Sequence, residues 1–335
     1  MTIPVLHSFR NSFPQVKMTV LTKAQFAPLF NSVDINLLIA DTKGEHKGFP
    51  GLWRLYKQIR SIHEPDAIAD LHNVLRSKLL RLFFSFSNVK IAVLDKKRDE
   101  MNQLVRKKNK VLTPLPSRYE RYQQVFKELG FDFTLRFHSI FPVGQTLRDE
   151  IVKCTGQKKN FWIGIAPFAA FQPKIYPAGK MKLVIQALLN DPSNKIFFFG
   201  GGKEETSLLA EWETEFVNTV SIAGKLSLAD ELILMSHLDV MVAMDSANMH
   251  FAALTSTPVV SIWGATHPAA GFTPWGQPAN QQVQIDLYCR PCSVYGNVPC
   301  YRGDHACMHD LPEKMILDKI LEIKNLNVSR PGHYK

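Results

Sequence analysis

The sequence predicts an α/β protein made of two Rossmann-like domains, each with a doubly wound parallel sheet, that face each other across a cleft. A chain of 335 residues is too long for one ordinary hydrophobic core and suggests two domains. Short apolar runs alternate with amphipathic segments along the whole chain, which favours a layered α/β architecture. In the second half the strand-like runs are almost continuously apolar, as is typical of parallel strands covered on both faces.

The first half holds four strand-like runs separated by helical segments. The clearest helices are expected at 73–85 and at 119–129, where Gly130 supplies an end signal. Residues 106–118 are basic and contain prolines, which is typical of an exposed loop. The strands are expected at 17–22, 35–41, 66–72 and 90–95.

A linker and a second α/β unit follow. Residues 140–156 contain Pro142 and Gly144 and are typical of a linker. We therefore expect domains at 1–155 and 156–335, with the last helix packing back on the first domain. In the second domain we expect strands at 161–168, 195–202, 219–224, 238–245 and 258–264, and helices at 178–190, 203–217, 227–236 and 246–255.

Positive charge is concentrated in the first half. Residues 1–155 carry 25 Lys and Arg against 14 Asp and Glu, a net charge of +11, whereas the remainder carries 15 against 16, a net charge of −1. One interpretation is a solvated basic surface. The other is a first domain that meets an anionic partner, such as a phosphorylated glycolipid, an anionic membrane face or a nucleic acid. No nucleic-acid-binding motif supports the last of these.

The composition, with 45% hydrophobic and 21% charged residues, is that of a globular protein in water. No apolar run is long enough to span a bilayer. The N-terminal residues lack the basic-then-apolar order of a signal peptide. We therefore expect a cytoplasmic protein.

Four of the five cysteines lie within 19 residues of one another, with two histidines nearby. A cytoplasmic location argues against disulfides. The spacing C-x2-C-x7-C-x6-C allows a small tetrahedral zinc site, although it fits no common zinc module closely, and four free thiols are the alternative. The zinc candidates are Cys289, Cys292, Cys300 and Cys307.

The end of the predicted strand at 238–245 carries the strongest signal for a binding site. Ligands of parallel sheets gather at the carboxyl ends of strands, beside helix N-termini whose free N–H groups suit phosphate. Asp245 stands at such an end, Ser246 and Ala247 open the next helix, and His250 follows one turn later. The alternatives are that Asp245 is only a helix N-cap and His250 only a core residue.

Other strand ends should reach the same edge of the sheet. Lys174 lies in a proline-flanked loop, where its ammonium could neutralise a diphosphate or simply be solvated. Glycines at 200–202 allow a ligand to approach the backbone closely. Glu204 or Glu205 could then accept hydrogen bonds from hydroxyls, or only occupy the first turn of a helix. The remaining candidates are Leu226, as an apolar wall for a flat ring, and Thr266, which is expected to point into the cleft.

These pieces, in this order, resemble glycosyltransferase family 9, the ADP-heptose:lipopolysaccharide heptosyltransferases, which have the two-domain GT-B fold. The resemblance runs from about Phe161 to Leu311 and is most specific in MDSANMHFAALTSTPVVSIWGATHP. It also includes FFFGGGKEE, SIAGKLSLADELILM and the late C-x-x-C. The first half is similar more loosely, through DAIADLHNVLRS and LPSRYERYQQVFKELG.

The resemblance implies a role for each matching residue and requires no cofactor beyond the ADP-sugar co-substrate. Lys174 would contact the phosphates and stabilise the leaving ADP. The family's Asp-Thr-Gly is Asp-Ser-Ala here, which keeps the hydroxyl and adds a methyl where glycine allows the closest approach. The implied donor-binding residues are Glu204 at the ribose, Leu226 at the adenine, and Asp245, Ser246, Ala247, His250 and Thr266.

The implied acceptor is the phosphorylated, Kdo-bearing inner core of lipopolysaccharide, an anionic glycolipid. The protein would meet it at the cytoplasmic face of the inner membrane, through peripheral contact and with no nucleic-acid partner. Arg76, Lys78 and Arg81 lie on the predicted helix after DLHN and are candidates for acceptor phosphate or carboxylate contacts. The alternative is that they form a solvated helix face.

The family's general base is an Asp in a Gly-Asp turn after a first strand, and the segment similar to MTIPVLHSFRNSFP follows that turn. Met1 aligns just beyond it, so we expect the base upstream of Met1 and the first strand missing from the first domain. Either the chain begins late, or the protein lacks the base. The expected function is inverting transfer of a heptose or related sugar from an ADP-sugar to a lipopolysaccharide inner-core acceptor. The alternative is a catalytically dead nucleotide-sugar-binding protein.

Overall fold

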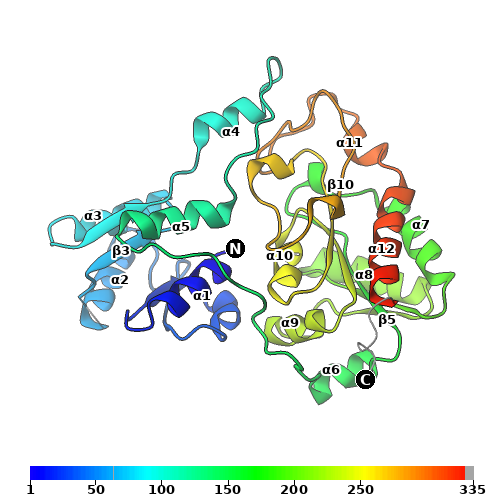
Figure 1. Cartoon of the computed structure of the whole chain (residues 1–335), viewed down its shortest axis with the longest axis horizontal. Coiled ribbons are helices and arrows are strands. Elements are labelled where there is room, and N and C mark those ends of the chain that lie inside the picture. The colour runs from blue at the N-terminus through cyan, green and yellow to red at the C-terminus, as the bar shows by residue number, and fades with distance from the viewer. Residues whose placement is uncertain (63, 329–335) are drawn as a thin grey trace. The chain divides into compact units, whose positions relative to one another are not determined.

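In the computed structural model, which describes residues 1–62 and 64–328, the chain divides into two compact units (Figure 1). The first unit comprises 1–98 and 116–137, and the second comprises 99–115 and the chain from 138 onward. The division therefore differs from the expected one at 155. Segment 138–155 is held by the second unit, because Ile140 N donates to Leu254 O (2.9 Å) and Lys195 Nζ donates to Thr155 O (2.8 Å).

All four strands predicted for the first unit are present, but the described residues form two separate parallel pairs where we expected one sheet. Strand β1 (Thr19–Thr22) pairs with β2 (Asn36–Ile39), and β3 (Ala67–Asp70) pairs with β4 (Lys90–Val93). The helical elements of residues 1–128 are α1 (Ile3–Ser12), the 3-10 helix η1 (Ala24–Phe30), α2 (Gly48–Ile62), α3 (Leu75–Phe84), α4 (Arg98–Leu104) and α5 (Arg118–Glu128).

Helices α2 and α3 cover one strand pair of the first unit. Leu52 and Leu55 of α2 are buried against Leu38 of β2, and Phe83 of α3 packs on the same cluster. These positions recur at helical spacing, so one face of each helix is removed from water, while the opposite faces stay exposed. Helix α5 begins with a capping box, in which Ser117 and Glu120 satisfy each other's backbone N–H groups.

The second unit contains a six-stranded parallel sheet in the order β10-β9-β8-β5-β6-β7. The strands are β5 (Phe161–Ala166), β6 (Asn194–Phe198), β7 (Thr219–Ser221), β8 (Val240–Met244), β9 (Val259–Ile262) and β10 (Gln282–Val283). The chain runs outward from β5 through β6 to β7, then returns to β8 on the other side of β5. The junction of β5 and β8 is therefore the topological switch point, where parallel α/β sheets bind ligands.

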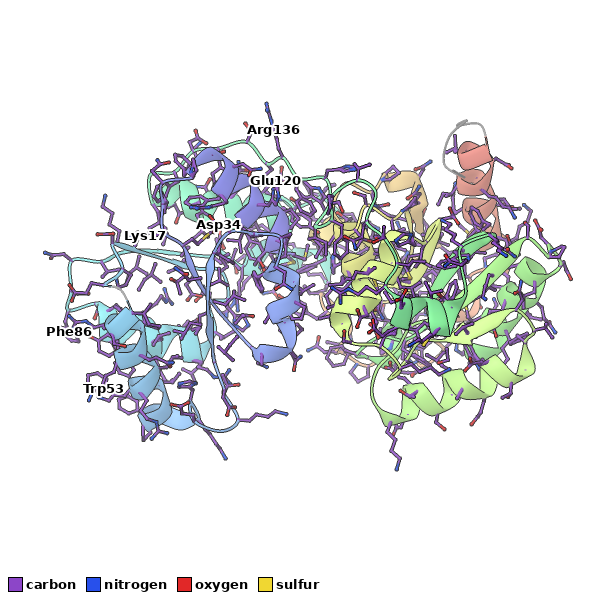
Figure 2. All side chains as sticks on the ribbon, turned by 90° about the horizontal axis from the view of Figure 1, so that it is seen from below. Lys17, Asp34, Trp53, Phe86, Glu120 and Arg136 are labelled. Carbon is purple, nitrogen blue, oxygen red and sulfur yellow. The ribbon has the colours of Figure 1, made fainter. Side chains whose placement is uncertain are left out.

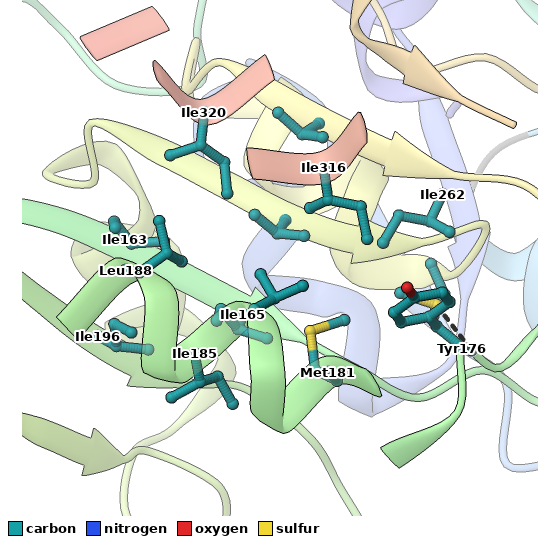
Figure 3. Close-up of a cluster of buried hydrophobic side chains, with 14 of the residues drawn as sticks. Ile163, Ile165, Tyr176, Met181, Ile185, Leu188, Ile196, Ile262, Ile316 and Ile320 are labelled. Atoms are coloured by element: carbon teal, nitrogen blue, oxygen red, sulfur yellow. Dashed lines mark hydrogen bonds between the residues drawn. The ribbon is translucent and has the colours of Figure 1, made fainter. Parts of the chain in front are cut away.

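Helices of the second unit cover the sheet and build its core. Every residue of β5 and β8 is buried, in agreement with their continuous apolar sequences. Figure 3 shows Ile163 and Ile165 of β5 packed with Met181, Ile185 and Leu188, which come from one helix of this unit. The helical elements are α6 (Asp149–Thr155), η2 (Gln172–Lys174), α7 (Ala178–Leu189), α8 (Lys203–Glu215), α9 (Leu228–Ser236), α10 (Ala247–Leu254), η3 (Pro268–Ala270), η4 (Ala279–Gln281), α11 (Ala306–His309) and α12 (Glu313–Val328).

Two differences from the sequence interpretation concern short elements. The expected linker at 140–156 contains helix α6, whose first turn carries Asp149 and Glu150 and whose end is marked by Gly156 at φ +72°. Ile151 is fully buried and anchors this helix. The last helix, α12, packs within the second unit against α7 and β9. Among the described residues, no helix is long and apolar enough to cross a membrane.

Candidate functional site

A pocket of about 390 Å³ lies in the second unit where β5 and β8 end, at the switch point of its sheet. Its lining comes from the loop after β5, from the first turn of α8, from the β8–α10 junction, from the segment after η3 and from the loop before α11. The lining residues are Phe168, Ala169, Ala170, Lys174, Glu205, Asp245, Ser246, Ala247, Asn248, His250, Phe272, Val294 and Tyr295.

Lys174 and Asp245 form an ion pair in this pocket. Lys174 Nζ lies 3.0 Å from Asp245 Oδ2, and the two side chains are only 11% and 12% exposed. An ammonium carries three donors, so the contact with Asp245 leaves protons of Lys174 available to a ligand. Asp245 thereby neutralises a buried cation and fixes its direction.

The N-terminus of α10 opens into the same pocket. Ser246 is the N-cap residue, but its side chain makes no capping hydrogen bond. Ser246 Oγ and His250 Nδ1 are both buried without a hydrogen-bond partner among the described residues. Buried polar atoms without partners are costly, and the first N–H groups of a helix lack intrahelical acceptors. Helix α10 thus begins at the pocket wall, and residues of its first turns line the pocket, which suits an anionic ligand.

His250 contributes to the pocket as a neutral imidazole. Burial lowers the pKa of His250 well below its ordinary range, and the Lys174 ammonium lowers this pKa further. The ring is thus uncharged at neutral pH, and one of its two nitrogens can donate while the other accepts.

The glycine run after β6 shapes the wall beside Glu205. A Cβ at Gly200 would lie 2.9 Å from Leu209 Cδ1, so a larger residue there would displace the buried Leu209 side chain. Gly201 N donates to Glu205 Oε2 (2.8 Å), which fixes the carboxylate in the pocket lining. Glu204, the residue favoured from the sequence, is exposed on the first turn of α8 and does not line the pocket.

Of the other three residues predicted to bind the donor, one lines the pocket and two do not. Ala247 lines the pocket as expected. Leu226 and Thr266 do not line it in this structure. Thr266 is 1% exposed, with its hydroxyl buried, because the loop after β9 turns it inward and away from solvent.

Two residues that the sequence did not single out hold Lys174 in place. Gly296 has φ +81°, and a Cβ there would lie 2.3 Å from Lys174 Cδ, so the lysine stem passes directly over this glycine. Arg290 is 3% exposed and donates to Gly264 O (2.5 Å) and Thr266 O (3.0 Å), which orders the loop after β9. That loop bonds the Lys174 loop through Ala265 N and Pro173 O (3.1 Å). The glycine at 296 is consistent with a positive φ, but nothing in the sequence indicated the role of Arg290.

In the first unit, Arg76 and Lys78 are exposed on α3, as expected for contact residues. Arg81 was predicted with them, but its guanidinium has an internal partner. Arg81 Nε lies 3.0 Å from Asp70 Oδ2, and the Asp70 side chain is only 5% exposed. Arg81 therefore neutralises a buried carboxylate at the end of β3, and its contact with an acceptor stays a prediction.

The four clustered cysteines are free thiols, of which Cys289 and Cys307 are buried. Burial raises the pKa of Cys307 to about 11, so this thiol is protonated at neutral pH. No three His, Cys, Asp or Glu residues in the described ranges come together as a metal site. The zinc interpretation thus stays a prediction, which metal analysis of the purified protein would test.

Comparison with known proteins places this architecture in a family. The model of glycosyltransferase family 9 (heptosyltransferase) matches residues 52–300. Lipooligosaccharide heptosyltransferase 2 of Campylobacter jejuni is 28% identical over 197 residues, which cover 57% of this chain and 56% of that protein. The chain thus spans just over half the length of this relative. Lipopolysaccharide heptosyltransferase 3 of Escherichia coli is 23% identical over 296 residues, 85% of this chain and 84% of the relative.

A solved structure extends the likeness to the fold. The Escherichia coli ADP-heptose lipopolysaccharide heptosyltransferase II superposes with a TM-score of 0.69 at 16% identity, covering 97% of this chain and 95% of that one. The two-domain GT-B fold expected from the sequence is confirmed by this likeness, and the family model covers well over half of the residues. The chain belongs to glycosyltransferase family 9, the heptosyltransferase family.

Proposed function

We propose that this chain transfers a heptose or a related sugar from an ADP-sugar to the inner core of a lipopolysaccharide, with inversion at the anomeric carbon. The observation that carries the proposal is the pocket at the β5–β8 switch point, which combines the buried Lys174 ammonium with unpartnered donors at the start of α10. The relatives named above act on lipopolysaccharide or lipooligosaccharide, and one structure is that of an ADP-heptose enzyme.

The diphosphate is assigned to the Lys174 side of the pocket. Helix N–H groups and a lysine together supply the donors and the positive charge that a diphosphate requires. Ser246 Oγ and His250 Nδ1 would gain their missing partners from phosphate or sugar oxygens. Because Asp245 cancels the charge of Lys174, affinity must depend strongly on these neutral donors as well as on the ammonium.

The remaining lining suits the nucleoside and the sugar. Glu205 has its carboxylate fixed in the wall, where it can accept hydrogen bonds from ribose hydroxyls, and we propose it in place of Glu204 for this role. Phe272 and Tyr295 lie with ring centroids 5.7 Å apart and offer apolar faces for a flat ring or a sugar. Leu226 and Thr266 would need to turn toward the pocket to take part.

In the transfer step the acceptor hydroxyl attacks the anomeric carbon from the face opposite the diphosphate. A C–O bond to the acceptor forms while the bond to the phosphate oxygen breaks, and its electron pair leaves with ADP. Lys174 and the α10 N–H groups stabilise the charge that develops on this leaving group. The hydroxyl proton must pass to a base. Asp245 is paired with Lys174 and Glu205 accepts from Gly201, so we assign that role to neither.

The acceptor is assigned to the basic first unit, where cations gather at the carboxyl ends of strands. Burial lowers the pKa of His72, and Lys96, Arg76 and Lys23 are close enough to affect it as well. Arg76 and Lys78 are exposed and free to meet phosphate or carboxylate groups of the inner core. Such an acceptor lies on the cytoplasmic face of a membrane, which is where we propose that the protein works.

A transfer assay tests this function. The chain is incubated with ADP-heptose and with lipopolysaccharide from a strain that lacks inner-core heptose, and the product is analysed by mass spectrometry. One added heptose with release of ADP is the expected result. Binding of ADP without any transfer would instead favour a nucleotide-sugar-binding protein, and absence of both would overturn the proposal.

A further inference from the structure

The outer faces of α2 and α3 carry exposed aromatic and apolar side chains that no described residue covers. Phe49 is 59% exposed, Trp53 42%, Leu82 53%, and Phe86, just after α3, is 90% exposed. Trp53 and Phe86 are labelled in Figure 2, where both belong to the first unit. Large apolar side chains exposed together on two adjacent helices mark an interaction surface more often than a solvated one.

Four aromatic side chains of α2 and α3 contact one another because the two helices pack together. The Phe83 ring lies 5.4 Å from that of Phe49, 5.1 Å from that of Trp53 and 5.6 Å from that of Tyr56, centroid to centroid. Phe49, Trp53 and Tyr56 follow one another at helical spacing along α2, beside the buried stripe of Leu52 and Leu55. We call Phe49, Trp53, Tyr56 and Phe83, together with the exposed Leu82 and Phe86 at the end of α3, the aromatic ridge.

Cations flank the aromatic ridge. Lys57 Nζ lies 5.9 Å from the Trp53 ring centroid, and the Arg60 guanidinium lies 6.0 Å from that of Tyr56. Segment 47–90 contains 8 Lys and Arg against 3 Asp and Glu, a net charge of +5. Apolar rings that can enter the headgroup region, bordered by Lys and Arg that can pair with phosphates, are the composition of a helix that lies in a membrane interface.

We propose that the aromatic ridge docks the first unit on a membrane surface rich in anionic phospholipid. Trp53, Phe49 and Phe86 enter the interface, while the exposed Lys57 contacts lipid phosphates. Arg60 joins it by exchanging its exposed pair with Glu64 for a phosphate. A protein partner would more often meet a rim of balanced charge, whereas segment 47–90 has a net charge of +5, which complements an anionic bilayer. Docking here does not depend on sugar transfer, so its test is separate from that of the proposed function.

Vesicle sedimentation of the full chain is the test, with phosphatidylglycerol–phosphatidylethanolamine vesicles and with phosphatidylcholine vesicles. We expect binding to the anionic vesicles, weakened by salt, and little binding to the zwitterionic ones. Phe86→Ser and Lys57→Glu should each weaken binding about five-fold or more. Both side chains are exposed, so thermal unfolding should be unchanged.

Matched controls lie in the second unit. Val217 is 88% exposed and Lys159 is exposed, so Val217→Ser and Lys159→Glu repeat the same chemical changes away from the aromatic ridge. Brominated lipid supplies a second readout, because Trp162, Trp212 and Trp263 are fully buried and the half-buried Trp275 belongs to the second unit. Quenching of tryptophan fluorescence should largely disappear in Trp53→Phe while sedimentation persists. Equal binding by ridge and control variants, or no preference for anionic vesicles, would overturn the proposal.

Discussion

At the scale of single residues, the site rests on one ion pair between groups that water barely reaches. The attraction between Lys174 and Asp245 offsets the cost of removing both charges from water, so removing one residue leaves an uncompensated buried charge. The contribution of this pair to stability therefore differs from its contribution to ligand binding. The two contributions can be separated by replacing both residues together.

We predict a strong coupling in a double-mutant cycle of Lys174→Met and Asp245→Asn. Each single change should lower the free energy of unfolding by about 3 kcal/mol, because a charge is stranded in the pocket. The double variant should lose less than the sum of the two. Urea unfolding measures all four proteins, and simple additivity would show that the pair is not coupled.

A second residue-scale prediction concerns Glu231 on α9. Burial raises the pKa of this carboxyl from 4.5 to about 7 in the folded protein. A raised folded-state pKa gives a contribution to stability that is full below the unfolded value and is lost as the pH rises through 7. The free energy of unfolding of Glu231→Gln, relative to that of the wild type, should therefore increase by about 1–3 kcal/mol as the pH rises from 4.5 to 8. Unfolding followed at several pH values checks this, and a constant difference would contradict it.

At the scale of elements, the loop before α11 positions the Lys174 side chain. The lysine stem lies over Gly296, and a methyl group there would overlap with Cδ and Cγ of the lysine. Gly303, in the same loop region, also has a positive φ (+79°), but a Cβ there would meet nothing within 4 Å. An alanine would therefore strain the backbone at either position, but only at 296 would its methyl group clash with Lys174.

Gly296→Ala should weaken ADP binding about ten-fold or more, because a displaced ammonium loses a charge-assisted bond to the diphosphate. Gly303→Ala should cost similar stability through its φ but leave ADP affinity near that of the wild type. Calorimetric titration gives both affinities. If the two variants bind ADP equally well, Gly296 does not position the lysine.

The element scale also shows what the sequence could predict. Strands β5, β6, β8 and β9 were correctly placed because a buried parallel strand is an apolar run bounded by loops, which is a local signal. Asp245 was placed at the pocket for the same reason, since it ends such a run, and its role there stays a prediction. Glu204 was preferred to Glu205 because the sequence does not show in which direction each side chain leaves the first turn of α8. The packing around Gly200 and the bond from Gly201 N direct the Glu205 side chain into the pocket wall.

Contacts that join distant segments were out of reach of the sequence. Gly296 and Lys174 are far apart in the chain, and nothing local to either predicts that one passes over the other. Arg81 resembled its exposed neighbours on α3, and only the burial of Asp70 revealed its internal partner. The short helix α6 was interpreted as a linker because Pro142 and Gly144 dominate the local composition, whereas buried Ile151 decides the structure.

At the scale of the whole molecule, the two units divide the chemistry by charge. The nearly neutral second unit carries the pocket, and its donors come from a helix terminus and one paired lysine. Most of the net charge of +10 belongs to the first half, with exposed cations beside the aromatic ridge and at the strand ends. A nucleotide-sugar in the second unit would contact oriented neutral donors, whereas a glycolipid at the first unit would contact exposed lysines and arginines.

Titration of ADP and of adenosine into the wild type and into Lys174→Met/Asp245→Asn tests the central claim, that the pocket holds a diphosphate, most directly. ADP should bind the wild type at least ten-fold more tightly than adenosine. The double variant, which has no stranded charge and keeps the neutral donors of α10, should lose part of that difference. Lys182→Met, which breaks the surface pair with Glu215, should bind ADP like the wild type. Equal affinities for ADP and adenosine in the wild type, or an undiminished difference in the double variant, would contradict the account.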